Sequence, residues 1–307
     1  MASTAHDLAP TSVDLAGRAE IGRPRSRGAR LRRLARRMGV RGILGLGMVG
    51  LITLVAVLAP VLAPYDVGKQ DYTAIMKSPS AAHLLGTDNL GRDVFTRVVY
   101  GAQASVRVGL MAVTLALILG TIVGLPSGYF GGWVDKIIMG LLDAQLAFPG
   151  LVLALAITAA LGPGLNNLIV AIGITATPTF GRLLRAQVLT LREREFVQAA
   201  RALGASDLRI SLRHILPNAI SPLIVQFSVA VGAAILTEAN LSFLGLGVQP
   251  PTPSWGSMLR EGYGFMDRAM WFPLSAGTII TLTVLGASFV GDALRDLFDV
   301  RARADVL

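Results

Sequence analysis

Long apolar stretches separated by polar segments dominate the sequence from residue 43 onward. A hydrocarbon core about 30 Å thick needs about 20 apolar residues to be crossed by a helix. Six stretches meet or approach that length, at residues 43–63, 106–126, 137–161, 165–181, 219–241 and 272–293. The pattern predicts an all-α integral membrane protein with six transmembrane helices.

Glycine and proline interrupt several of these stretches, at Gly120, Gly124, Pro149, Pro178 and Pro222. In lipid, broken backbone is tolerated only where neighbouring helices or a water-filled cavity satisfy its polar groups. We therefore expect the helices to bend and to pack as a bundle. Close packing through small residues accounts for most of the glycines, whereas Pro149 is the better candidate for a functional kink.

Basic residues are distributed unevenly between the polar segments. Ten arginines lie between residues 18 and 41, and seven more lie between residues 182 and 213. The segments 65–105 and 247–271 each carry equal numbers of acidic and basic residues. Because cytoplasmic segments of membrane proteins are enriched in Lys and Arg, we expect both basic segments and both termini to be cytoplasmic.

Composition supports a membrane protein and excludes several functional classes. The 307 residues are 53% hydrophobic and only 15% charged, whereas soluble domains have about 25% charged residues; mean hydropathy is +0.60. Without cysteine, thiolate metal sites and disulfides are impossible. The net charge is +9, but no aromatic stacking pattern accompanies the basic runs, so we do not expect a nucleic-acid partner. We also expect no bound metal.

The same features predict how the chain is organised. We expect a basic cytoplasmic tail (1–41), a first transmembrane helix with an outer loop (42–105), a core with five helices (106–295) and a cytoplasmic C-terminal tail (296–307). The first span follows 41 mostly polar residues, so it is not a cleaved signal peptide. Residues 30–41 fit either a basic helix lying on anionic lipid or a solvated orientation signal.

The loop 182–217 of that core has the strongest local signals. Glu195 to Leu203 is rich in good helix formers, and Gly204 suits the residue after a helix, where φ turns positive. Ser206 or Asp207 can cap a second short helix, which Pro217 would end. A compact helix–turn–helix outside the bilayer can seat in a groove of another protein or simply join two spans.

Here the sequence resembles a known family. Gln198-Ala199-Ala200, followed by Gly204 and by Ile215-Leu216-Pro217, is similar to the EAA loop of binding-protein-dependent ABC importer permeases. Gln198 departs from the glutamate that is usual there. The resemblance implies a coupling helix that docks into a cleft of an ATPase subunit. It assigns this role to Gln198, Ala199, Ala200, Arg201, Leu203, Gly204, Ala205 and Asp207.

Three further stretches, at residues 83–95, 142–150 and 238–256, resemble the OppC/DppC-type branch that transports peptides or nickel. The resemblance covers roughly residues 40–295 and implies a type I (MetI-like) permease bundle in the bacterial inner membrane. It also implies a second homologous permease, two subunits that bind ATP and Mg, and an extracytoplasmic solute-binding protein. The expected solutes are di- or oligopeptides, with glutathione or nickel as alternatives.

Charged residues inside membrane spans usually face a bundle interior or a water-filled path. Asp143 and Glu238 lie within or near predicted spans, where each either lines a translocation pathway or makes an interhelical hydrogen bond. The complete set of candidate pathway residues is Asp143, Phe148, Pro149, Glu238 and Asn240.

The outer loops offer further candidates. Thr87-Asp88-Asn89 is expected to cap an outer helix or to touch the solute-binding protein. Trp255 and Trp271 are expected at the membrane interface.

A nucleotide-binding signature is missing from the sequence. Lys69, Lys77 and Lys136 are its only lysines, and none completes the Gly-x-x-x-x-Gly-Lys-Ser/Thr motif that cradles phosphates. We therefore expect a non-catalytic subunit whose partners hydrolyse ATP. Two other classes remain open: a secondary transporter driven by an ion gradient, and a membrane scaffold that binds an ATPase without transport.

Overall fold

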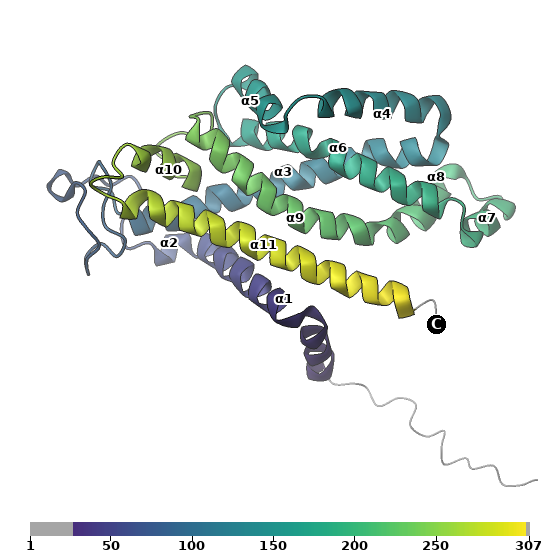
Figure 1. Ribbon diagram of the computed structural model, residues 1–307, viewed down its shortest axis with the longest axis horizontal. Helices are drawn as coiled ribbons and strands as arrows, with labels where there is room; N and C mark the ends of the chain where they lie inside the picture. The colour runs from purple at the N-terminus through teal and green to yellow at the C-terminus, as the bar shows by residue number, and fades with distance from the viewer. Residues whose placement is uncertain (1–26, 305–307) are drawn as a thin grey trace, which may run out of the picture. The chain divides into compact units, whose positions relative to one another are not determined.

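A computed structural model describes the backbone of residues 27–304 and the side chains of residues 38–298 (Figure 1). The regular structure of this part of the chain is helical, with one isolated bridge between Thr87 and Asp93 in the largely irregular segment before α3. The helices are α1 (Arg27–Val57), α2 (Ala59–Leu62), η2 (Tyr72–Ala74), α3 (Val94–Phe130), α4 (Gly132–Leu146), α5 (Gly150–Leu161), α6 (Leu165–Leu191), α7 (Glu195–Ala202), α8 (Asp207–Arg209), η3 (Ile210–Ile215), α9 (Leu216–Phe243), α10 (Trp255–Tyr263) and α11 (Trp271–Ala304).

The basic tail lies mostly outside the described residues. Its last part is helical from Arg27, and the helix breaks at Gly39, where φ is 63°; whether residues 30–41 lie on lipid stays a prediction. The described residues divide into two compact units after Arg37. The description below concerns the second unit.

Within residues 27–304, five helices are long and apolar enough to cross a membrane, and a bent pair of helices adds a sixth span if it counts as one. The bent pair is α4 and α5, whose axes differ by 91°. The span predicted over 137–161 is therefore a bent pair of helices, and the bend expected at Pro149 is present. Pro149 precedes α5 in an extended conformation (φ −55°, ψ 125°), because the proline ring cannot continue a helix.

The second span is longer than predicted. It begins at Val94, where the Asp93 carboxylate accepts a hydrogen bond from the Thr96 N–H at 2.7 Å and caps the helix. Polar residues such as Arg97 and Gln103 interrupt the apolar run that the sequence pattern relies on. The helix expected after residues 87–89 is thus the first part of α3, but Asp93 caps it, so the prediction that Thr87-Asp88-Asn89 supplies the cap is wrong.

Helices α3 and α6 approach each other through glycine. A Cβ at Gly124 would lie 2.4 Å from the carbonyl oxygen of Gly181, and a Cβ at Gly120 would lie 2.5 Å from the Cβ of Phe180. Gly128 continues the row, with the Cβ of Val188 at 2.8 Å. Glycines four residues apart lie on one helix face and let two backbones touch. The core of the bundle is therefore built on this α3–α6 contact.

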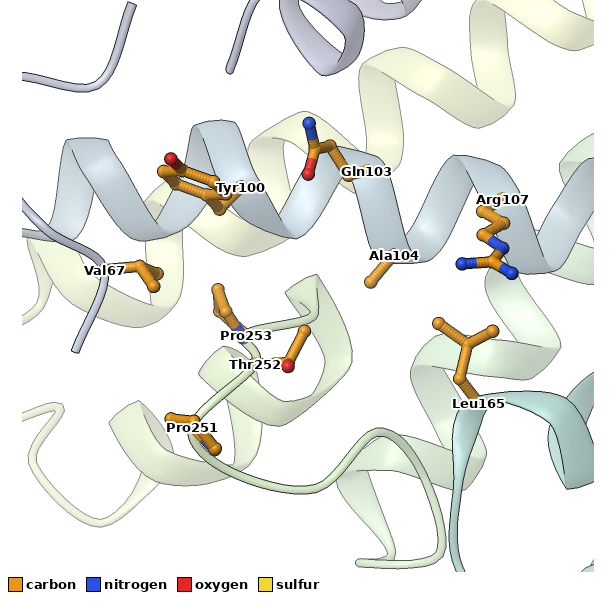
Figure 2. A pocket seen from close by; sticks show the side chains of 9 residues that line it. All are labelled: Val67, Tyr100, Gln103, Ala104, Arg107, Leu165, Pro251, Thr252 and Pro253. Atoms are coloured by element: carbon orange, nitrogen blue, oxygen red, sulfur yellow. The ribbon is translucent and has the colours of Figure 1, made fainter. Parts of the chain in front are cut away.

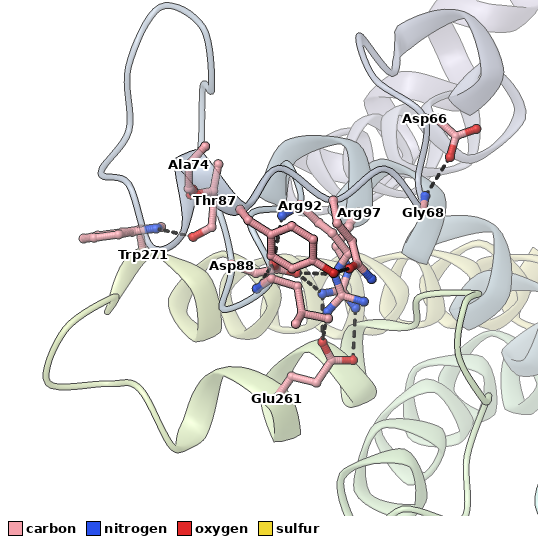
Figure 3. A network of polar contacts seen from close by, with 12 residues as sticks. Asp66, Gly68, Ala74, Thr87, Asp88, Arg92, Arg97, Glu261 and Trp271 are labelled. Atoms are coloured by element: carbon pink, nitrogen blue, oxygen red, sulfur yellow. Dashed lines mark hydrogen bonds and ion pairs between the residues drawn. The ribbon is translucent and has the colours of Figure 1, made fainter.

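At the end of the bundle that carries α10, buried ion pairs connect the loop before α3 to α10 (Figure 3). Arg92 binds Asp88 at 2.7 Å and Glu261 at 2.6 Å, and Arg97 binds Glu261 at 2.8 Å and also Asp88. The Asp88 side chain is fully buried, so each charge depends on its partners. This geometry gives the segment around Asp88 a structural role.

The two tryptophans of this region differ in their surroundings. Trp255 is fully buried, and its indole N–H donates to the Val98 carbonyl at 3.0 Å. Its ring lies against Gly101 of α3, and the expected depth of Trp255 at the membrane interface stays a prediction. The indole N–H of Trp271 donates to the Thr87 carbonyl at 3.3 Å, on the same loop as the ion pairs (Figure 3).

We predict that Gly124→Ala destabilises the bundle by about 1–3 kcal/mol, as overpacking does elsewhere, because the added methyl meets the Gly181 backbone. The midpoint of thermal unfolding in detergent measures this loss. Gly140→Ala is the matched control, since a Cβ there has no neighbour within 4 Å. Equal midpoints for the two variants would contradict the close approach of α3 and α6.

Candidate functional site

The connection between α6 and α9 forms a compact projection, which we call the elbow (residues 192–217). It lies at the end of the bundle opposite α10 (Figure 1). Gly204 ends α7 with a φ of 78°, which confirms the predicted left-handed turn. The Gly204 N–H donates to the Arg201 carbonyl at 3.0 Å and the Ala205 N–H to the Ala200 carbonyl at 3.1 Å. This double closure is the Schellman motif, which fixes the direction of the chain after α7.

The second arm of the elbow is held differently from the prediction. Ser206 occupies the N-cap position of α8, but its side chain makes no capping hydrogen bond. Asp207 does not cap the helix either; its carboxylate accepts a hydrogen bond from the Tyr129 hydroxyl at 2.6 Å. Tyr129 lies at the end of α3. The arm is therefore held by the bundle rather than by a local cap.

Pro217 does not end the second arm, contrary to the prediction. Helical backbone runs without a break from Asp207 to Phe243, and residues Ile210–Ile215 form a π-helix in which the Leu216 N–H donates to the Ser211 carbonyl. A proline ring clashes with the carbonyl four residues before it in a regular α-helix. The wider π turn before Pro217 relieves that clash, so the elbow continues directly into α9.

Burial divides the elbow into a fixed base and an exposed surface. Val197, Ile210 and Ile215 are fully buried in the main core. On the outside, Leu203 is 88% exposed and Leu208 is 70% exposed. Two large apolar side chains that project from an anchored base are typical of a surface that another protein covers.

The eight predicted coupling residues fall on both sides of this division. Ala200 and Ala205 are partly buried and pack against the core, so they hold the elbow and do not lie on its outer surface. The exposed members of the set are Gln198, Ala199, Arg201, Leu203, Gly204 and Asp207.

Two polar side chains of the elbow have defined surroundings. The amide of Gln198 donates to the Glu193 carbonyl at 3.1 Å, a bond that the glutamate usual at this position could not donate. The phenol of Tyr129, next to Arg201, raises the pKa of that guanidinium above its ordinary value. Arg201 thus keeps its positive charge on the exposed surface of the elbow.

A group of polar contacts, which we call the joint, lies beside the elbow, where α3 and α6 end and α4 begins. Arg185 of α6 binds both oxygens of Asp135 of α4, each at 2.5 Å, and the Ser127 hydroxyl of α3 donates to the same carboxylate at 2.5 Å. Arg192 donates to the Gly128 carbonyl at 3.1 Å. Sequence reasoning missed the joint, because its members are far apart in the sequence and no periodicity links them.

Comparison with known proteins identifies the family. The model of the binding-protein-dependent transport system inner membrane component matches residues 106–304. The chain belongs to this family. A second model, the N-terminal transmembrane domain of oligopeptide transport permease C, matches residues 31–79. The protein is therefore a permease subunit of an ABC importer.

Relatives of this permease carry names from one transport branch. It is 47% identical to the dipeptide transport system permease protein DppC of Alkalihalophilus pseudofirmus, over 85% of this chain and 86% of the relative. A putative peptide transport system permease protein of Brucella suis biovar 1 is 44% identical, with 89% and 92% covered. The glutathione transport system permease protein GsiD of Pectobacterium atrosepticum is 43% identical, with 81% and 83% covered.

Among solved structures, an amino acid ABC transporter with histidines aligns with 67% of this permease and 94% of its own chain, at 17% identity and a TM-score of 0.49. The family assignment rests on the sequence matches alone.

The candidate pathway residues do not converge in this permease. Asp143 of α4 forms an ion pair with Arg182 of α6, and both side chains are at least half exposed. Phe148 is 59% exposed beside Pro149 at the bend. Asn240 lines a groove of about 380 Å³ with residues of α10 and α11. Their role in translocation stays a prediction.

Glu238 of α9 makes an interhelical hydrogen bond, one of the two roles expected for it. It is fully buried and accepts hydrogen bonds from the hydroxyls of Ser105 at 2.9 Å and Ser242 at 2.7 Å. Ser242 lies on the same helix, whereas Ser105 lies on α3, so the bond from Ser105 joins two spans of the permease.

We predict that Tyr129→Phe loosens the elbow, because it removes the bond to Asp207. Such a bond contributes about 1 kcal/mol, so amide hydrogen exchange in α7 and α8 should rise roughly fivefold. Hydrogen–deuterium exchange mass spectrometry of the purified permease measures this. Tyr263→Phe serves as the control, since that side chain is 66% exposed. Unchanged exchange in the Tyr129 variant would show that the bond does not hold the elbow.

Proposed function

We propose that the elbow docks onto a separate ATPase subunit and transmits its movement to the bundle, which imports di- or oligopeptides. The observation that carries this proposal is the exposure of Leu203 and Leu208 on a base whose residues Val197, Ile210 and Ile215 are fully buried. Apolar side chains on a short helix favour a hydrophobic groove of a partner. A firmly anchored base allows force on the exposed surface to reach the spans.

Two sets of contacts support transmission from the elbow. Pro217 does not interrupt the helix from Asp207 to Phe243, so movement of α8 carries the following span with it. The bond between Asp207 and Tyr129 leads to α3, and the Asp135–Arg185 pair joins α4 to α6. Rigid-body movement of packed helices is a common form of domain closure. In this proposal the partner ATPases supply the closing step.

The orientation follows from the charges near the elbow. Arginines surround it, whereas the loops around α10 carry balanced charge, so the positive-inside bias places the elbow in the cytoplasm. The termini are then cytoplasmic, and the membrane is the bacterial inner membrane. In the proposed assembly, a second homologous permease, two subunits that bind ATP and Mg, and an extracytoplasmic solute-binding protein complete the importer. This chain binds no cofactor and hydrolyses no ATP.

The proposed solute is a short peptide. Relatives named for dipeptide and peptide transport share 44–47% identity with this chain over most of its length. Glutathione is a second candidate, since a relative named for its transport is 43% identical. Glutathione is itself a tripeptide, so both candidates are small solutes that carry terminal carboxylates.

We predict that Leu203→Asp lowers the affinity of the permease for its ATPase by roughly tenfold, because a charge then enters the apolar centre of the interface. Binding of the purified ATPase to the permease in detergent measures this. Leu84→Asp is the matched control: that leucine is 59% exposed in the loop before α3. Normal ATPase binding by the Leu203 variant would show that the elbow does not form the interface with the ATPase.

A second experiment separates an ATP-driven importer from the other classes. Proteoliposomes that contain the full complex should take up peptide only with ATP, and orthovanadate should stop uptake. Uptake that persists without ATP hydrolysis would indicate an ion-coupled transporter. Uptake that is unaffected by omission of this chain would indicate a scaffold.

A further inference from the structure

A cavity of about 340 Å³ lies at the α10 end of the bundle, away from the elbow (Figure 2). One wall is the first half of α3. The opposite wall is the start of α6 and the loop before α10. Its lining is Val67, Tyr100, Gln103, Ala104, Arg107, Leu165, Pro251, Thr252 and Pro253. Binding pockets for small ligands have volumes of about 300–1,000 Å³, so the cavity can hold part of a short peptide.

The α3 wall is one face of a helix. Tyr100, Gln103, Ala104 and Arg107 are spaced three or four residues apart, which brings them to the same side. The Gln103 amide donates to the Ala56 carbonyl at 2.9 Å, so its N–H is engaged on α1. Arg107 is left to present its guanidinium on the side of Ala104 and Leu165, as Figure 2 shows.

Arg107 also faces a second cavity. This space, of about 420 Å³, is lined by Arg107, Gly164, Leu165, Asn166 and Asn167. Arg107 and Leu165 belong to both linings. Arg107 therefore stands where two hollows meet, one with prolines and the other with two asparagines in its lining.

The charge of Arg107 is not balanced locally. Neither cavity has an acidic residue in its lining, and among the described side chains no ion pair includes Arg107, unlike Arg97 on the same helix. Arg107 is exposed and lies at the start of the apolar stretch 106–126 of α3. Charged residues of membrane-spanning helices commonly face a water-filled cavity and mark a substrate path.

We propose that Arg107 binds the terminal carboxylate of a peptide as the peptide enters the bundle. A guanidinium matches a carboxylate with two parallel N–H···O bonds. The apolar walls formed by Leu165, Pro251 and Pro253 take the adjoining side chain. This inference rests on the proposed transport of peptides and adds a specific site to it.

The chain offers a direct probe of this site, because it contains no cysteine. Thr252 is exposed in the cavity wall, so Thr252→Cys places a single thiol in this chain near Arg107. The variant is incorporated into the full importer complex in nanodiscs. Its modification by anionic sulfonatoethyl and cationic trimethylammonium-ethyl methanethiosulfonate is followed by mass spectrometry of this chain, relative to a free thiol.

The anionic reagent should react roughly fivefold faster, because Arg107 attracts it. Arg107→Gln in the same background should remove this preference. Arg268→Gln is the matched control: its side chain is 74% exposed beside Asp267 and lines neither cavity, so the preference should stay. A preference that survives Arg107→Gln, or a thiol that does not react in the complex, would overturn the proposal.

Protection experiments identify the ligand. L-alanyl-L-alanine should slow modification of the thiol, whereas its C-terminal amide should not, and Arg107→Gln should abolish the protection. Equal protection by acid and amide would overturn the proposal. The same measurement is made in nanodiscs of anionic lipid and of zwitterionic lipid. If anionic lipid protects the thiol and the peptide does not, the site binds a lipid headgroup, and the proposal is overturned.

ATP-dependent peptide uptake by the same complex is measured in parallel. A complex that transports peptide but shows no protection rejects the Arg107 site alone. A complex with no ATP-dependent peptide uptake rejects the proposed function, and with it the assignment of a peptide ligand.

Discussion

The close approach of α3 and α6 is the constraint on which the rest of this permease depends. Gly120, Gly124 and Gly128 bring the α3 backbone against Gly181 and its neighbours, where no larger side chain fits. Lipid provides little hydrophobic drive for helices to associate, so van der Waals contact between backbones is a main source of cohesion. Both functional regions are attached to this pair: α6 leads into the elbow, and α3 carries Tyr129 at one end and Arg107 at the other.

The two ends of the α3–α6 pair are stabilised by different means. Near the elbow, the contacts are partly exposed charges and one phenol, which can be rearranged at modest cost. At the α10 end, Asp88 is buried among Arg92, Arg97 and Glu261, and Glu238 is enclosed by two serines. Buried charges that lose a partner are strongly destabilising. The α10 end therefore carries the more deeply buried polar contacts of the pair, and the elbow end carries contacts that are partly exposed.

The sequence was sufficient for the helical class, the approximate spans and the turn at Gly204, because apolar length and glycine placement act locally. It was insufficient for features that depend on contacts between residues far apart in the chain. Polar residues such as Arg97 interrupt the apolar pattern in the first part of α3, so the pattern did not predict a helix there. The charge of Arg97 is balanced by Glu261, which is remote in the chain. Pro217 indicated the end of a helix, but the π-helix before it makes room for the proline ring, and the helix continues. The position of Trp255 in an outer loop suggested an interfacial residue, whereas its burial depends on contact with Val98 of α3, which no local pattern indicates. Ala200 matched a docking motif, yet it packs inward.

The central claim is that the elbow and the α3–α6 pair move as one body when partner ATPases close. Spin labels at Arg194, next to α7, and at Ile118, a 51% exposed residue of α3, test it by double electron–electron resonance. In the complete importer, the distance between these two labels within one chain should be the same in the nucleotide-free and ATP-trapped states, while the distance between the labelled elbow and the partner permease changes. A nucleotide-dependent change in the distance within the chain would contradict the account.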